Sequence, residues 1–362
     1  LPRRFLEPSG WESYLSSVDQ GEVRFTSLAL NGRLAELRGL SSAGLESSLT
    51  FDAEVRHLTA RPMSTDTLPV RNVNGQLSWE KGVLNFKNFA GTYGQSRLEN
   101  VSGSRGRTAS GSEFWEARVQ GEADLGELYQ QARSKLFPQA FVGPLAALRE
   151  LSGKAAVNLT LRDDSESSSQ VQGEIALVDT MLRTDTVVLK DMRGQLNISP
   201  SVIATEKIVA SFAGSPVTLR GSIRDYASAT RSYDVTAESS RVSAGEISHL
   251  FFGSGSAQDP GTVRGWLRYR GGGMKPGEGN LSGVVELQGI QPPLEGFRQP
   301  PRQISGVVSF DGNRIDLQAI KGSIGNFGLE FSGQLRLGER PSLPFTLSSP
   351  EMDIGVLLPR TT

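Results

Sequence analysis

The feature that most constrains this chain is a long phrase that occurs three times in the same register. The copies begin at Gly75 (GQLSWEKGVLNFKNFAGTYGQSRLENVSG), Gly194 (GQLNISPSVIATEKIVASFAGSPVTLRGS) and Gly306 (GVVSFDGNRIDLQAIKGSIGNFGLEFSGQL). The three leading glycines are 119 and 112 residues apart. Self-similarity at a fixed period is the signature of a tandem array, in which each unit buries its apolar surface against its neighbours.

A second repeated phrase supports the same period. It reads WEARVQGEADLGELY, YDVTAESSRVSAGEISHLF and PFTLSSPEMDIGVLLP, and its matching glycines are Gly126, Gly245 and Gly355. These glycines are 119 and 110 residues apart. Because two phrases share one spacing, duplication explains the pattern much better than chance.

Within each copy, apolar and polar side chains alternate with period two, which is typical of strands with one apolar and one polar face. In the third copy Val308, Phe310, Ile315 and Leu317 are apolar, and a DGN turn beginning at Asp311 separates the two pairs. We therefore expect Phe310 and Ile315 to face each other, with Ile198 and Ile203 as the equivalent pair in the second copy. Each copy is predicted to be a set of hairpins.

These patterns predict a mainly-β fold, a long antiparallel sheet built from tandem repeats with a few short helices. A sheet with one apolar face must lay that face against protein or against an apolar ligand. If the sheet curls, the repeated apolar positions all line one trough, and some two dozen strands spaced by ~4.8 Å span roughly 100 Å. The predicted lining residues are Leu77, Trp79, Leu84, Phe86, Phe89, Tyr93, Leu196, Ile198, Ile203, Ile208, Phe212, Val217, Leu219, Val308, Phe310, Ile315, Leu317, Ile320, Ile324, Leu329 and Phe331.

The chain is expected to divide at the repeats. Helices are predicted near the N-terminus, where Ser9 and Glu12 form a capping-box pattern, and within Asp124 to Leu151 at an edge or mouth of the sheet. Loops are predicted at Asp163 to Ser169 and Gly271 to Gly279. The expected regions are residues 1–40 with the N-terminal helix and first strands, 41–150 with repeat unit 1 and its edge helices, 151–265 with repeat unit 2, and 266–362 with repeat unit 3.

Composition argues against several classes of function. Lys and Arg number 38 against 39 Asp and Glu, so no nucleic-acid partner is implied, and the absence of cysteine excludes thiol chemistry. His57 and His249 are the only histidines, and neither lies in a metal-ligand or catalytic-triad pattern. Asp311, Asp316 and Glu330 fall on the polar face as solvated residues. We expect no enzyme activity, no metal and no cofactor.

The ends of the sequence suggest a piece of a longer protein. The chain begins at Leu1 without Met, and it has neither an apolar run near ~18 residues nor a signal-peptide pattern. We expect a soluble segment.

Taken together, the repeated phrases and the closing SPEMDIGVLLP resemble the AsmA-like family of Gram-negative envelope proteins, with its TamB- and YhdP-type relatives and repeats like those of bridge-like lipid transfer proteins. The resemblance covers the three units from about Leu49 onward. It implies a curled, taco-like sheet, open along one side, whose concave apolar groove carries phospholipid acyl chains between inner and outer membranes. It also implies a periplasmic location, an inner-membrane anchor outside this segment, and inner- and outer-membrane components as partners at the ends of the full-length protein.

Two alternatives remain open from the sequence. The same alternation arises in a β-sandwich or β-solenoid whose apolar faces cover each other, which suits an envelope scaffold assisting outer-membrane protein assembly without a lipid conduit. A polysaccharide-active enzyme needs clustered carboxylates on one strand face, and the sequence has none. The deciding observation is whether the apolar faces are closed by protein or left open.

Overall fold

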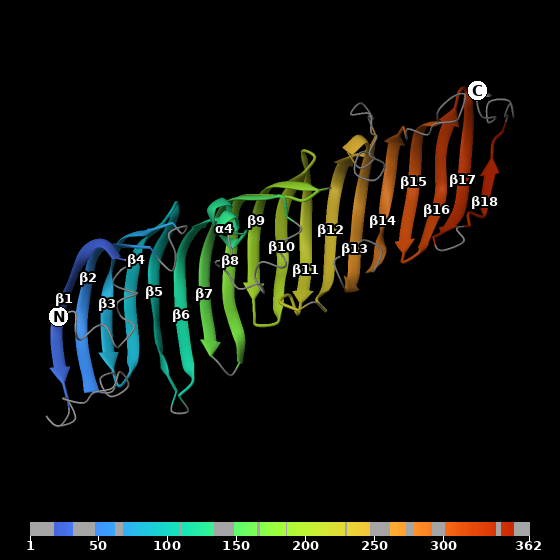
Figure 1. Cartoon of the computed structure of the whole chain (residues 1–362). Coiled ribbons are helices and arrows are strands. Elements are labelled where there is room, and N and C mark those ends of the chain that lie inside the picture. The colour runs from blue at the N-terminus through green and yellow to red at the C-terminus, as the bar shows by residue number, and fades with distance from the viewer. Residues whose placement is uncertain are drawn as a thin grey trace. The chain divides into compact units, whose positions relative to one another are not determined.

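The computed structural model consists of one antiparallel sheet of 18 strands that is not closed, so the prediction of a mainly-β open sheet is confirmed. Within β1 to β7 and within β10 to β18, each strand pairs with the next one in sequence (Figure 1). The structure describes residues 18–31, 48–61, 68–108, 111–133, 148–164, 167–185, 187–228, 230–246, 261–272, 279–291, 301–337 and 342–350.

The strands are mostly 10 to 13 residues long. Their bounds are β1 (Val18–Leu30), β2 (Leu49–Ala60), β3 (Val70–Glu80), β4 (Val83–Tyr93), β5 (Ser96–Arg107), β6 (Glu113–Asp124), β7 (Glu150–Asp164), β8 (Ser167–Arg183), β9 (Val188–Ile198), β10 (Val202–Phe212), β11 (Ser215–Arg224), β12 (Ser232–Ser243), β13 (Thr262–Gly272), β14 (Gly279–Ile290), β15 (Pro301–Asp311), β16 (Arg314–Ile324), β17 (Phe327–Arg336) and β18 (Phe345–Ser348).

The chain separates into two compact units. Unit 1 comprises residues 1–138, 152–178 and 196–200, and unit 2 comprises residues 139–151, 179–195 and 201–362.

The three repeated phrases fold into equivalent strands. The second strand of each copy begins eight residues and ends eighteen residues after the leading glycine, as β4, β10 and β16. The third strand begins twenty-one residues after that glycine in every copy, as β5, β11 and β17. Two linking strands follow each of the first two copies, namely β7 with β8 and β13 with β14. The structural repeat is therefore a set of six strands.

β-Bulges recur at fixed places in these repeats. Three residues before each leading glycine, Asn72, Asp191 and Gln303 adopt φ angles of 51°, 52° and 54°. Thirteen residues after the glycine, Asn88 and Ala319 adopt φ angles of 54° and 47°, and the strand register shifts at both places. An extra residue in one strand of a pair leaves a backbone N–H without a ladder partner.

Side chains from the adjacent strand accept the hydrogen bonds that the bulges leave open. The N–H of Asn88 donates to Ser102 Oγ at 3.0 Å. The N–H of Ala319 donates to Ser332 Oγ at 3.2 Å. The bulges are thus built into the sheet by specific polar contacts rather than left as defects.

The leading glycines are explained by close packing across the strands. In unit 1 a Cβ atom on Gly75 would lie 2.4 Å from the ring of Phe89. In unit 2 a Cβ atom on Gly306 would lie 2.6 Å from Ile320 Cδ1. Phe89 and Ile320 occupy the same position of their copies, so the repeat pairs a glycine with a large apolar side chain that covers it.

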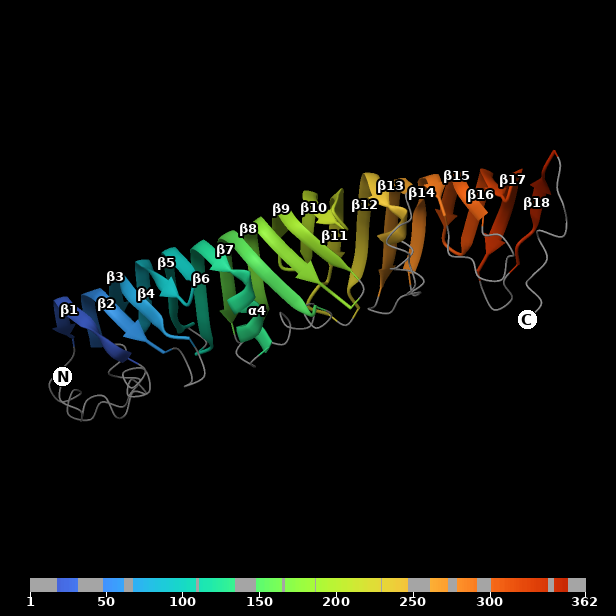
Figure 2. The same ribbon diagram turned by 90° about the horizontal axis from the view of Figure 1, so that it is seen from above.

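One α-helix is described in unit 1, α4 (Leu125–Arg133), and Figures 1 and 2 both place it beside β7 and β8. Asp124 caps it, since the N–H of Glu127 donates to Asp124 Oδ1 at 2.9 Å. Tyr129 and Ala132 are buried. The second helix expected before Leu151 and the N-terminal helix at Ser9 lie outside the described residues.

The predicted loops are shorter than expected where they can be seen. The charged segment expected to be a loop from Asp163 to Ser169 is mostly strand, because β7 runs to Asp164 and β8 begins at Ser167. Polarity alone therefore overestimated the length of the loop. β13 likewise runs to Gly272, and the remainder of the glycine-rich segment lies outside the described residues.

Candidate functional site

Strand register decides which side chains share a face, because residues directly opposite in an antiparallel pair point the same way. In unit 1 Leu77 lies opposite Phe86, and Trp79 lies opposite Leu84. The polar residues between them, such as Ser78, point to the other side. We call the side that carries these four residues the apolar face and the opposite side the polar face, and we use the same terms in unit 2.

Beyond the bulge in β4 the apolar face of unit 1 continues through Phe89 and Tyr93. The rings of Phe86 and Phe89 are 6.3 Å apart at 89°, an edge-to-face contact. Tyr93 lies opposite Ser96. Burial first, and then the nearby carboxylate of Glu127, raises the pKa of Tyr93. The Tyr93 phenol therefore stays neutral at physiological pH.

The third copy supplies much of the apolar face of unit 2. Phe310 lies opposite Ile315 across the turn, and Val308 lies opposite Leu317. The same face carries Ile320 opposite Phe331, Leu329 opposite Gly322, and Ile324 opposite Phe327.

The second copy adds its own positions on β10 and β11. Ile208 lies opposite Leu219, Val217 lies opposite Ala210, and Phe212 lies at the closing turn opposite Ser215. Ile203 lies opposite Ile223. Leu196 and Ile198 are at the end of β9 and are partly exposed.

The apolar faces remain accessible to solvent over most of the predicted lining. Among the predicted lining residues, only Ile208, Val217, Val308 and Ile324 are buried, and the others are partly exposed. In a closed β-sandwich the large side chains of two inner faces interdigitate and bury each other. Within the part of the chain that the structure describes, these faces do not show that degree of burial.

Several strands contribute apolar-face residues that are absent from the predicted lining. Phe25 on β1, Trp115 on β6 and Phe345 on β18 are 46%, 37% and 59% exposed. Register places each of them on the apolar face of its own unit. Leu267 and Val285 join the face in unit 2. Alternation within TVRGWLRYRGG was the available signal for Leu267. Trp115 and Phe345 lie at the start of the second repeated phrase, from which no lining position was predicted.

One end of the apolar face in unit 1 has a polar border. Arg105 lies opposite both Leu84 and Trp115, and its guanidinium is 3.7 Å from Glu113. Trp115 Nε1 donates to Asp163 Oδ2 at 3.2 Å. The hydrocarbon-like surface of this unit therefore stops near the β5–β6 turn.

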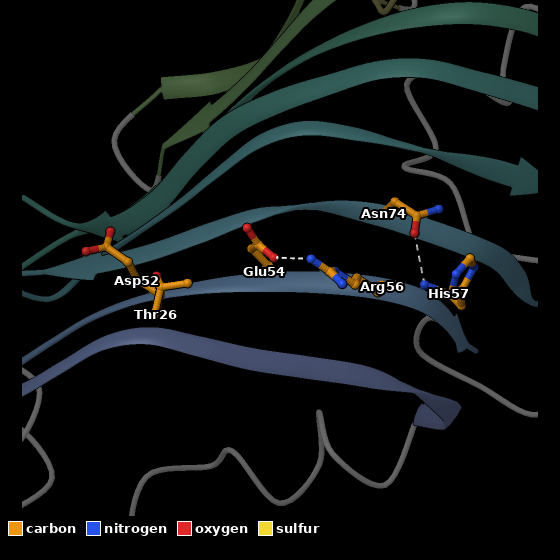
Figure 3. Close-up of polar contacts among 6 residues, drawn as sticks. All are labelled: Thr26, Asp52, Glu54, Arg56, His57 and Asn74. Carbon is orange, nitrogen blue, oxygen red and sulfur yellow. Dashed lines mark hydrogen bonds and ion pairs between the residues drawn. The ribbon is translucent and has the colours of Figure 1, made fainter.

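The polar face carries ordinary solvated ion pairs, and His57 has a structural position there. Glu54 pairs with Arg56 at 2.8 Å, and the N–H of His57 donates to Asn74 Oδ1 at 3.0 Å; Figure 3 shows both contacts. His57 Nδ1 lies 2.8 Å from Asn72 Oδ1. Two asparagine side chains next to the bulge thus hold His57, and among the described residues no nucleophile or carboxylate contacts it. His249 lies outside the described residues.

The carboxylates expected on the polar face are there, and ionisation of Asp316 is favoured. A hydrogen bond from Arg314 first, and then one from Gln334, lowers the pKa of Asp316. Among the described residues, no three His, Cys, Asp or Glu side chains are placed together so that they could hold a metal ion. In the same part of the chain, no helix is both long and apolar enough to cross a bilayer.

Comparison of the chain with known proteins gave no match to any protein family, curated protein or solved structure.

Proposed function

We propose that this chain is a segment of an AsmA-like envelope protein that carries phospholipid acyl chains along an apolar β-groove between inner and outer membranes. The observation that carries the proposal is the partial exposure of the repeated apolar positions, including Phe310, Ile315 and Leu317 in unit 2. An accessible surface of this kind lowers the free energy of an acyl chain by about 0.8 kcal/mol for each methylene that leaves water.

The chemistry of the surface suits movement along it. Across the third copy the apolar face offers aliphatic and phenylalanine side chains, with glycines such as Gly322 and Gly333 between them. These groups supply contact area but no hydrogen bonds that fix a chain in one position. Phospholipid is therefore the proposed cargo, with the periplasm as the proposed location, an inner-membrane anchor outside this segment, and membrane components as partners at the ends of the full protein.

The experiment that tests this function places a charge on the apolar face. We expect Phe310→Asp to reduce lipid crosslinking from a photo-crosslinker at Leu317 by more than half, because a buried carboxylate among acyl chains is costly. Ile198→Asp is expected to act in the same way in the second copy. Ser309→Asp is the matched control, since it adds the same charge on the same strand but on the polar face.

The outcomes separate the two main hypotheses. Mass spectrometry of lipids that co-purify with the wild-type segment establishes whether phospholipid is bound at all. If folded Phe310→Asp keeps wild-type crosslinking and activity, the lipid conduit is wrong. If Phe310→Asp fails to fold while Ser309→Asp folds, the apolar face is a closed core, and the scaffold function is favoured.

A further inference from the structure

The polar face of unit 2 contains a cavity of about 440 Å³ near the ends of β11, β12 and β13. Register places its side chains together: Arg224 lies opposite Ser232, Ser222 lies opposite Asp234, and Asp234 lies opposite Arg270. Its charged and hydroxyl side chains lie on the polar face, whereas Tyr233 and Gly271 are at apolar-face positions, and the cavity was not predicted from the sequence. The lining residues are Ser222, Arg224, Ser232, Tyr233, Asp234, Arg270 and Gly271.

The only carboxylate of the lining is already neutralised by a residue next to the cavity. Arg268 Nε and Nη2 donate to the two carboxylate oxygens of Asp234, both at 2.6 Å. This bidentate hydrogen bond is the largest cause that lowers the pKa of Asp234. Arg270 Nε is farther from the same carboxylate, at 3.4 Å. Most of the hydrogen-bonding capacity of Arg270 is therefore free to meet another anion.

Arg224 supplies a second positive charge without a counter-ion. Its guanidinium forms no ion pair or side-chain hydrogen bond among the residues that the structure describes. Asp225 follows it in sequence, yet no ion pair joins the two. The cavity thus combines two guanidinium groups, two serine hydroxyls and one carboxylate that a third arginine satisfies, which leaves it with an excess of positive charge.

We propose that this cavity, the Arg224 pocket, binds a phosphate group. Arg224 and Arg270 act as charged donors, and the hydroxyls of Ser222 and Ser232 donate to the remaining phosphate oxygens. The planar fork of arginine matches the spacing of phosphate oxygens and gives bidentate, charge-assisted hydrogen bonds. The four proposed phosphate-binding side chains lie on the face opposite the proposed lipid surface, so their function does not depend on the lipid proposal.

The first test is titration of the whole segment with inorganic phosphate by calorimetry. We expect Arg224→Gln and Arg270→Gln each to weaken phosphate binding by about tenfold, as expected for loss of a charge-assisted contact. Arg302→Gln is the matched control, because it removes the same charge from an exposed position on the polar face of β15. Thermal unfolding of each variant verifies that it is folded. Among the described residues the Arg224 side chain has no hydrogen-bond or ion-pair partner, so its substitution removes no such contact from the fold.

The second test separates a free phosphate from a lipid headgroup. The segment is sedimented with phosphatidylcholine vesicles and with vesicles that also contain phosphatidylglycerol. Binding of inorganic phosphate and of the acidic vesicles, both dependent on Arg224, supports a headgroup site; binding of phosphate alone supports a site for a soluble phosphate. If neither probe binds, or if Arg302→Gln weakens binding as much as Arg224→Gln, the Arg224 pocket is not a phosphate site.

Discussion

Two structural features favour glycine at position 306. One is its own backbone conformation, and the other is the close approach of Ile320 on the adjacent strand. The φ angle of Gly306 is 153°, in a region that side chains disfavour, and a Cβ atom there would be 2.8 Å from Ile320 Cα. The steric conflict is with backbone as well as side chain, so rotation of Ile320 cannot relieve it. The sequence shows the glycine at this place in all three copies, but only the structure shows what covers it.

Replacement of this glycine should therefore weaken the sheet. We expect Gly306→Ala to lower the free energy of unfolding by about 1–3 kcal/mol, measured by urea denaturation. Gly328→Ala is the control, because a Cβ atom there meets no atom within 4 Å. Equal effects of the two substitutions would show that the close approach to Ile320 does not determine stability.

The carboxylate of Asp316 should make stability depend on pH. Its pKa is lowered from the ordinary 3.8 by hydrogen bonds from Arg314 and Gln334, so the folded state binds a proton less readily than the unfolded state. This contribution is present above pH 3.8 and is lost as the pH falls through the folded-state pKa. We expect Asp316→Asn to be less stable than wild type at pH 7 and equally stable at low pH.

Thermal unfolding across this pH range measures the difference. Arg314→Gln removes the main cause of the shift and is expected to show the same loss at pH 7. If Asp316→Asn is as stable as wild type at every pH, the ion pair contributes nothing, as happens for many exposed pairs.

Among whole elements, the strands were predictable and the bulges were not recognised. In the first copy the apolar positions Leu84 and Phe86 are two positions apart and even-numbered. The next apolar positions, Phe89 and Tyr93, are odd-numbered, so the alternation changes phase. That change is the sequence signal of the bulge at Asn88. The change of phase alone does not identify a bulge, because an extra residue is defined only by the register of the strand against its partner.

The bulge on β14 offers a direct test of these contacts. The N–H of Gly289 donates to Ser305 Oγ at 3.0 Å, and Ser305 precedes the leading glycine of its copy. We expect Ser305→Ala to lower the free energy of unfolding by about 1 kcal/mol, because the partly buried N–H then lacks its acceptor. Ser305→Thr keeps a hydroxyl and should retain most of that stability; equal losses in urea denaturation would contradict the role of the hydrogen bond.

The candidate site was only partly predictable for a related reason. The repeated positions on β3, β4, β15 and β16 were found because copies of the first phrase could be compared. Phe25 lies outside the repeated phrases, and Trp115 lies in the second phrase, from which no lining position was predicted. Whether an apolar face is covered depends on contacts between distant strands. A covered face and an open face have the same local alternation of apolar and polar residues, so the sequence pattern does not distinguish them. The Arg224 pocket likewise joins three strands whose sequences contain no phosphate-binding motif.

At the scale of the molecule, strands that contact mainly their neighbours need not unfold together. All residues of β1 are exposed, whereas the adjacent β2 buries Phe51, Ala53 and Val55. Stability in such arrays is a sum of local and neighbour terms, so it differs along the chain. The buried side chains of β2 make it the more stable strand.

Hydrogen exchange measured by mass spectrometry can test that difference. We expect peptides from Val18–Leu30 to exchange at least about tenfold faster than peptides from Leu49–Ala60, since local opening of β1 exposes little additional apolar surface. Equal protection of the two strands would mean that they open as one cooperative unit.

The bulges also determine where this chain can change length. Leu98 and Leu329 both lie twenty-three residues after their leading glycines, but Gly103 lies twenty-eight residues after Gly75, and Gly333 lies twenty-seven after Gly306. The additional residue of the first copy falls where the register of β5 shifts, between Leu98 and Asn100. Elsewhere in a strand, a one-residue insertion would turn every following side chain to the wrong face. Bulges are therefore the positions at which duplicated copies can gain or lose a residue during evolution while both faces of the sheet are preserved.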